Sequence, residues 1–265
     1  MAKKRSGWNK RVYEKRLAEG RGQGEGMNYR PWLTIHDFPS RGYAVRIKGQ
    51  TIPREYHLMS RLERDYFTCL DWNDQVTDIR EQYPMRLQDT LRIADMAGIR
   101  HPADPGSGFP VVMTTDFLIT TADRIYARAV KPSEDLSKPR VLEKFEIERR
   151  YWKSKGIDWK IVTEKQINTK RAANIRWLCG GVSPSELMPD KYVLEDCTEL
   201  FLELFREPDI PFRDVILVTE QYGRLLPGTA LSIYKELVRR KKIIFDLDAA
   251  FDLERQAAFG RRAYI

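Results

Sequence analysis

Residues 114–133, TTDFLITTADRIYARAVKPS, place a short polar turn between two apolar stretches. This pattern predicts a β-hairpin. If its turn centres on Ala122 and Asp123, Asp116 faces Ala129 across the hairpin and lies diagonal to Lys131 on the same face. Diagonal neighbours lie about 7–8 Å apart at the backbone, within reach of one bound group. Two interpretations stay open: a partly buried salt bridge, or the metal-binding face of a nuclease.

The segments around the hairpin predict an α/β domain. Ser60 precedes a helical pattern at 60–72, with Glu63 three residues on, which is typical of a capping box. The rest of the order is strand 76–84, helix 87–98, hairpin, helix 139–156 and strand 158–164. Such an order predicts a mixed sheet flanked by helices.

Charge and pattern divide the chain into three predicted regions: a basic arm at 1–30, an α/β domain at 31–167 and a mostly helical C-terminal domain at 168–265. We expect a short basic helix at 8–19 on a flexible glycine-rich tether at 20–26. Short strands in 29–60 should lie against the larger body. The C-terminal domain should be mostly helical, and a short strand at 243–252 after a helix at 228–242 predicts a winged-helix-like fold.

The net charge of +8 is concentrated at the start of the chain. Residues 1–30 hold nine basic and three acidic side chains, whereas residues 169–265 are neutral overall. A basic arm favours a polyanion such as double-stranded DNA, although a solvated leader is the alternative. The candidate phosphate contacts are Lys3, Lys4, Arg5, Lys10, Arg11, Lys15 and Arg16. The neutral C-terminal domain is as suited to a protein partner as to DNA.

Other classes of protein are excluded by simple counts. The cysteines, Cys69, Cys179 and Cys197, are far apart without a CxxC pair, which argues against a disulfide framework and a structural zinc site. No run approaches 18 apolar residues, and MAKKRSGWNK lacks the apolar core of a signal peptide. We therefore expect a cytoplasmic protein without a membrane partner.

Glu63 adds a second carboxylate to the Asp116 and Lys131 side chains of the hairpin. Two carboxylates and a lysine suit phosphodiester hydrolysis, because the carboxylates hold Mg²⁺ and the lysine stabilises the charge of the transition state. This pattern favours the nuclease interpretation.

Nearly the whole chain resembles the TnsA endonuclease family of heteromeric bacterial transposons. The resemblance is carried by EGRGQGEG, YRPWLTIHDFP, MSRLERDYF, VTDIREQYP, GIRHP, TTDFLI, AVKP and LEKFEIERRYW. It implies a restriction-endonuclease-like domain followed by a winged helix. It also implies Mg²⁺- or Mn²⁺-dependent cleavage of the 5′ transposon ends in a nucleoid-associated complex. The implied partners are a TnsB-like transposase, which cuts and joins the 3′ ends, and a TnsC-like ATPase regulator.

Carried over to this chain, the family's catalytic positions fall on Glu63, Asp116, Lys131 and Glu148. Glu63 and Asp116 would hold the metal, with the Val130 carbonyl completing the shell, while Glu148 would support or position. Ala129 departs from the pattern, since the family has glutamine there and alanine has no side-chain oxygen. Water, backbone or a DNA phosphate must then fill that coordination site.

Two further expectations remain open. His101, in the loop before the hairpin, is a candidate DNA contact or a hydrogen-bonded structural residue. The absent oxygen at Ala129 also leaves a different class of function open, a non-catalytic subunit that binds transposon DNA and bridges the transposase and the ATPase.

Overall fold

The computed structural model describes residues 7–37, 43–188 and 190–262. The chain divides into two compact units, Met1–Asn168 and Thr169–Ile265. The boundary predicted after residue 167 lies one residue before this division. The described part of the predicted basic arm, residues 7–30, is grouped with the first unit, and residues 1–6 lie outside the described residues.

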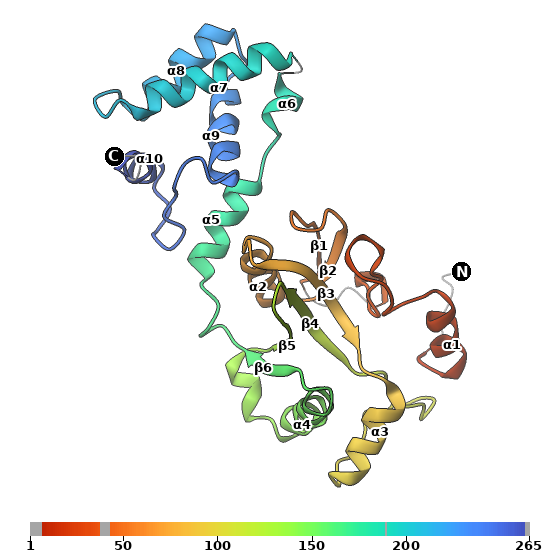
Figure 1. Cartoon of the computed structure of the whole chain (residues 1–265). Coiled ribbons are helices and arrows are strands. Elements are labelled where there is room, and N and C mark those ends of the chain that lie inside the picture. Colours follow the sequence, from red (N-terminus) through yellow and green to blue (C-terminus); the bar gives the residue numbers. More distant parts are fainter. Residues whose placement is uncertain (1–6, 38–42, 189, 263–265) are drawn as a thin grey trace. The chain divides into compact units, whose positions relative to one another are not determined.

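The first unit is an α/β domain with two sheets (Figure 1). Its helices are α1 (Lys10–Ala18), α2 (Arg61–Asp71), α3 (Leu87–Met96) and α4 (Pro139–Ser154). Its strands are β1 (Val45–Lys48), β2 (Glu55–Leu58), β3 (Val76–Pro84), β4 (Thr114–Thr121), β5 (Ile125–Val130) and β6 (Asp158–Val162). These elements match the predicted order of helices and strands.

The larger sheet has the order β3-β4-β5-β6 and is mixed, because only β5 and β6 run parallel. The hairpin of β4 and β5 pairs Phe117 with Arg128 and Thr120 with Ile125. This is the register predicted from a turn at Ala122 and Asp123, so that prediction is confirmed. β1 and β2 form a separate antiparallel pair.

Both faces of the sheet are covered, since successive β4 side chains enter different cores. Phe117 and Ile119 pack with Phe67 of α2. Leu118 instead packs with Ile147 and Trp152 of α4. A strand buried on both faces reads as a continuous apolar run, as "FLI" does.

The N-terminal segment is packed against the first unit, which corrects the expectation of a flexible tether. The Trp8 indole donates to the Pro110 carbonyl over 2.8 Å. In the glycine-rich segment, the Gly26 N–H donates to Asp78 Oδ2 of β3 over 3.2 Å. A Cβ on Gly22 would lie 2.1 Å from Pro84 Cγ, so only glycine permits this close approach.

Among the described residues of the second unit, the regular secondary structure is helical and no strand is present. Its helices are α5 (Thr169–Cys179), α6 (Pro184–Leu187), α7 (Lys191–Arg206), α8 (Phe212–Gly223), α9 (Thr229–Arg239) and α10 (Leu253–Arg262). They enclose a cluster of Phe201, Phe205, Phe212 and Tyr234. The strand predicted at 243–252 is wrong, because those residues form turns and coil, and the winged-helix assignment is not confirmed.

None of the described helices in either unit is long and apolar enough to cross a membrane.

Candidate functional site

Glu63 is fixed at the start of α2 by its own capping interactions. Ser60 Oγ accepts the Glu63 N–H over 3.1 Å, as the predicted capping box requires. The Glu63 carboxylate turns back, and its Oε2 accepts the Met59 N–H over 2.9 Å. The side chain is buried and has one orientation imposed by the helix start.

Asp116 is fixed by the hairpin. Its Oδ2 accepts the Val130 N–H over 2.7 Å, so β5 holds the carboxylate of β4. The predicted contribution of the Val130 carbonyl to a metal shell stays a prediction, since the contact seen here is made by the amide. Ala129 is buried and leaves the space beside Asp116 without a side-chain oxygen.

Gln82 of β3 joins these two carboxylates. Its amide nitrogen lies 3.4 Å from Glu63 Oε2 and 3.3 Å from Asp116 Oδ1. Residues distant in the sequence therefore meet at one buried amide. Sequence reasoning did not single out Gln82, although three successive polar residues inside a strand, Arg80, Glu81 and Gln82, were a signal that this strand buries polar groups.

The electrostatics of the site are dominated by the burial of two carboxylates. Burial raises the pKa of Glu63, and the negative charge of Asp116 raises it further. Burial likewise raises the pKa of Asp116, although the Val130 N–H, the Gln82 amide and the positive charge of Lys131 oppose this. A carboxylate pair with raised pKa values favours a proton or another cation between its members.

Lys131 follows directly after β5 and keeps its side chain partly exposed. Its Nζ lies 3.3 Å from Asp135 Oδ2. Among the described residues its ion pair is therefore with Asp135, while Asp116 is held by amides. This arrangement does not support the salt-bridge interpretation of the Asp116 and Lys131 pair.

Glu148 of α4 is bound to Thr115, the residue before Asp116, and to β6. Its Oε1 accepts hydrogen bonds from Thr115 Oγ1 over 2.7 Å and from Trp159 Nε1 over 2.9 Å. Burial raises the pKa of Glu148 to about 8, and the charge of Asp116 contributes. The contacts tie α4 to β4 and β6 next to Asp116, as expected of a supporting residue; its predicted catalytic role stays a prediction.

Comparison with known proteins gives a family for this arrangement. A family model described as "TnsA-like endonuclease N terminal" matches residues 73–164, and one described as "TnsA endonuclease C terminal" matches residues 166–247. The transposon Tn7 transposition protein TnsA of Escherichia coli is 45% identical over 181 residues. That alignment covers 67% of this chain and 66% of the Tn7 protein.

The chain belongs to the TnsA-like endonuclease family. The carboxylate site spans both the part before the first family match, with Glu63, and the matched part, with Gln82 and Asp116. The boundary between the two family matches, at residue 165, falls three residues before the end of the first unit at Asn168.

The candidate DNA-binding residues of this TnsA-like chain have different surroundings. Lys3, Lys4 and Arg5 lie outside the described residues. On α1, Lys10, Arg11 and Lys15 are exposed, whereas Arg16 is largely buried and bound to Asp37. Arg16 also lies over the rings of Trp8 and Trp32, which favours a structural role. Its phosphate contact stays a prediction.

His101 is engaged within the protein. Its Nε2 lies 3.0 Å from Thr90 Oγ1 and its Nδ1 lies 2.9 Å from the Pro102 carbonyl. Partial burial lowers the pKa of His101, which favours the neutral ring. These contacts favour the structural interpretation, and a DNA contact stays a prediction.

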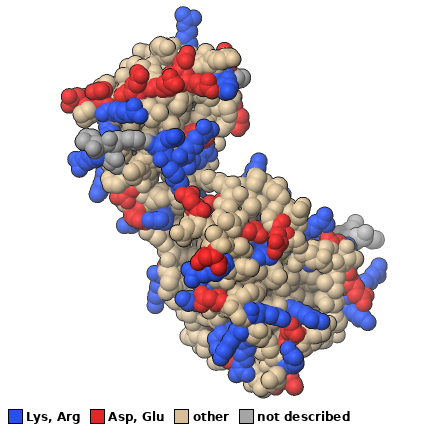
Figure 2. Space-filling view, viewed as in Figure 1, with Lys and Arg blue, Asp and Glu red and all other residues tan. Residues whose placement is uncertain are grey.

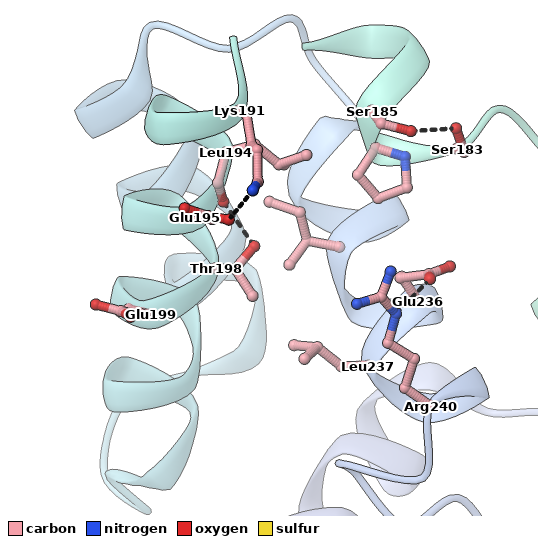
Figure 3. A pocket seen from close by; sticks show the side chains of 12 residues that line it. Ser183, Ser185, Lys191, Leu194, Glu195, Thr198, Glu199, Glu236, Leu237 and Arg240 are labelled. Atoms are coloured by element: carbon pink, nitrogen blue, oxygen red, sulfur yellow. Dashed lines mark hydrogen bonds and ion pairs between the residues drawn. The ribbon is translucent and has the colours of Figure 1, made fainter. Parts of the chain in front are cut away.

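The second unit contains a cavity of about 450 Å³ between α6, α7 and α9 (Figure 3). Leu194, Ile233 and Leu237 line its apolar part. The basic side chains at its rim are already paired, Lys191 with Glu195 and Arg240 with Glu236. Figure 2 also shows a band of acidic side chains across the α7 face of this unit. Neither surface suits a DNA backbone.

Proposed function

We propose that this chain is a metal-dependent DNA endonuclease that cleaves the 5′ ends of a transposon, the non-transferred strands, together with a TnsB-like transposase. One observation carries the proposal: the carboxylates of Glu63 and Asp116 meet at a single buried amide, beside the end of β5 where Lys131 follows. The TnsA-like endonuclease matches support the class of reaction.

The donor atoms of this site fit a hard divalent cation such as Mg²⁺ or Mn²⁺. Carboxylate oxygens are the ligands that Mg²⁺ prefers. The negative charge of Asp116 raises the pKa of Glu63, and within the described residues no Lys, Arg or His side chain forms an ion pair with either carboxylate. The same residues contain no group of three or more His, Cys, Asp or Glu side chains arranged for a metal. The protein would thus fill only part of the shell, which Mg²⁺ tolerates because it retains several waters.

The chain's own residues would position the reacting groups. A bound cation would supply an activated water and balance charge on the leaving oxygen. Glu63 and Asp116 are each fixed by a backbone N–H, from Met59 and Val130, so their oxygens are oriented before any ligand arrives. Such preorganisation lowers the reorganisation needed in the transition state.

Lys131 is suited to the phosphate. Its side chain is 37% exposed, and its partner Asp135 also binds Lys138. Because this ion pair is at the surface, its contribution to stability is small and a phosphate can displace it. We propose that Lys131 stabilises the charge that develops on the phosphate, while Glu148 positions β4.

DNA binding would draw on the exposed cations of the first unit, among them Lys10, Arg11 and Lys15 of α1. For the second unit we propose protein contacts, to the TnsB-like transposase or to a TnsC-like ATPase regulator, because its net charge is zero. Its acidic α7 face supports this choice over DNA.

Strand-specific cleavage of donor DNA, with the TnsB-like partner present, tests the proposal. Asp116→Asn and Lys131→Ala should each lower 5′ cleavage by at least about 100-fold, the usual effect of losing a group that stabilises transition-state charge. Asp123→Asn, at the tip of the same hairpin, and Lys138→Ala are matched controls that should retain activity.

The result also separates this proposal from a non-catalytic role. Intact 5′ cleavage in both site variants would overturn the assignment. Cuts confined to the 3′ ends with the unaltered chain would favour the architectural subunit instead.

A further inference from the structure

Gln82 occupies the position that a cation shared by Glu63 and Asp116 would take. Its amide nitrogen contacts one oxygen of each carboxylate, and its amide oxygen accepts the Thr114 hydroxyl over 3.1 Å. The side chain is only 4% exposed. A buried amide with every contact directed at a candidate metal ligand or its neighbouring strand is more than a packing residue.

The backbone of Gln82 has an unusual conformation at the point where its side chain contacts the two carboxylates. Its φ is +48°, a left-handed conformation that is strained for a residue other than glycine. The neighbours Glu81 and Tyr83 still pair with Phe117 and Thr115, so the strand register continues across the irregular residue. Strain of this kind, maintained inside a regular strand, is typical of functional sites.

We propose that Gln82 is the third side-chain ligand of the cation site, beside Glu63 and Asp116, with an amide that turns over when the cation binds. Without a cation, the amide nitrogen holds the two carboxylates together. With one bound, a half-turn of the amide would direct its oxygen to the cation. Gln82 thus supplies the side-chain oxygen that Ala129 lacks.

The Thr114 hydroxyl makes both amide orientations acceptable. It donates to the amide oxygen in this structure. After the half-turn it would accept from the amide nitrogen, because a hydroxyl is both donor and acceptor. The change therefore leaves a partner at each end of the amide, the cation for its oxygen and Thr114 for its nitrogen.

This inference rests on the proposed function, since it concerns the same site, and cation binding tests it without cleavage. Titration calorimetry of the full chain with Mn²⁺ measures affinity. Gln82→Met, which keeps the length but has no oxygen ligand, should bind Mn²⁺ at least about tenfold more weakly. Gln82→Glu should bind more tightly, and Mn²⁺ should raise its Tm more than that of the unaltered chain. Gln88→Glu, on the exposed side of α3, should match the unaltered chain in both measurements.

A spectroscopic readout separates ligation from packing. The side-chain NH₂ resonances of Gln82, assigned by their loss in Gln82→Glu, should shift on addition of Mg²⁺. A residue that is not a ligand would give equal Mn²⁺ affinity in Gln82→Met, and unchanged resonances on addition of Mg²⁺ would overturn the proposed turn of the amide. If Gln82→Met does not fold, weaker or unaltered Mn²⁺ binding by Gln82→Glu overturns the inference.

Mn²⁺ binding by Asp116→Asn shows whether a negative result contradicts the proposed function or only the role of Gln82. If it binds Mn²⁺ as the unaltered chain does, the proposed metal-dependent function fails. If it loses binding while Gln82→Met retains full affinity, only the role of Gln82 fails.

Discussion

Glu148 shows how a single buried carboxylate affects the stability of the whole first unit. It is 4% exposed and accepts two hydrogen bonds through Oε1, from Thr115 and Trp159. These bonds favour the charged form, yet burial and the charge of Asp116 outweigh them and raise its pKa to about 8. Ionisation of this group at neutral pH therefore opposes folding.

We predict that Glu148→Gln raises stability at pH 8, because the amide oxygen can accept both hydrogen bonds without a charge. The folded state, with a pKa of about 8, retains the proton up to about pH 8, whereas the unfolded chain releases it near the ordinary glutamate pKa of 4.5. The contribution of Glu148 is thus most favourable below that value and declines as pH rises through 8. Urea unfolding at pH 5 and pH 8 should show a gain on the order of 2–4 kcal/mol confined to the higher pH. An equal gain at both values would contradict this account.

At the scale of elements, the hairpin and the start of α2 were predictable because local rules decide them. Turn position sets the pairing register, so Asp116 and Ala129 could be placed from the sequence. A serine followed by glutamate at the third position sets a helix start, and Ser60 and Glu63 make that contact. The contact of both carboxylates with Gln82 was not predictable, because it depends on a left-handed residue inside a strand, which no local propensity indicates.

The cap of α2 gives a test of this element. Ser60→Ala should lower stability by about 1 kcal/mol through loss of the cap. It should also weaken Mn²⁺ binding, because the helix start that orients Glu63 is loosened. Asn9→Ala removes the equivalent cap of α1, where the Asn9 side chain accepts the Val12 N–H, and serves as the matched control. It should cost similar stability and leave Mn²⁺ affinity unchanged; equal loss of affinity in both variants would count against the orienting role of Ser60.

At the scale of the whole molecule, the second unit shows why a strand was wrongly predicted from the sequence at residues 243–252. Residues 243–252 begin with an apolar run typical of a strand, and Ile243 and Phe245 are buried. In this segment, backbone groups of residues 246–249 form hydrogen bonds with side-chain amides instead of with a neighbouring strand. Gln256 bonds both the N–H and the carbonyl of Asp246, and Asn174 donates to the carbonyls of Leu247 and Ala249. Apolar pattern alone cannot distinguish these two solutions.

The same unit exposes an apolar patch that supports its proposed role in protein contacts. Leu217, Val218 and Tyr222 of α8 and Leu226 after it are 52%, 42%, 63% and 63% exposed. The spacing of four residues places Val218 and Tyr222 on one face of α8. Grouped apolar side chains at a surface mark interaction sites, whereas single ones are ordinary.

We therefore predict that replacing this patch with serine, in Leu217→Ser, Val218→Ser, Tyr222→Ser and Leu226→Ser combined, reduces co-purification with the TnsB-like or TnsC-like partner at least about tenfold. The reason is the loss of apolar area buried at an interface, at roughly 25 cal/mol per Å². Leu142→Ser, at a residue of α4 that is 47% exposed, is the matched control and should leave co-purification intact. The patch variant should keep its thermal transition and its Mn²⁺ affinity, because the replaced side chains face solvent in the other unit from the carboxylate site. Full recovery of both partners with the patch variant would remove this surface from consideration and leave the acidic α7 face as the next one to test.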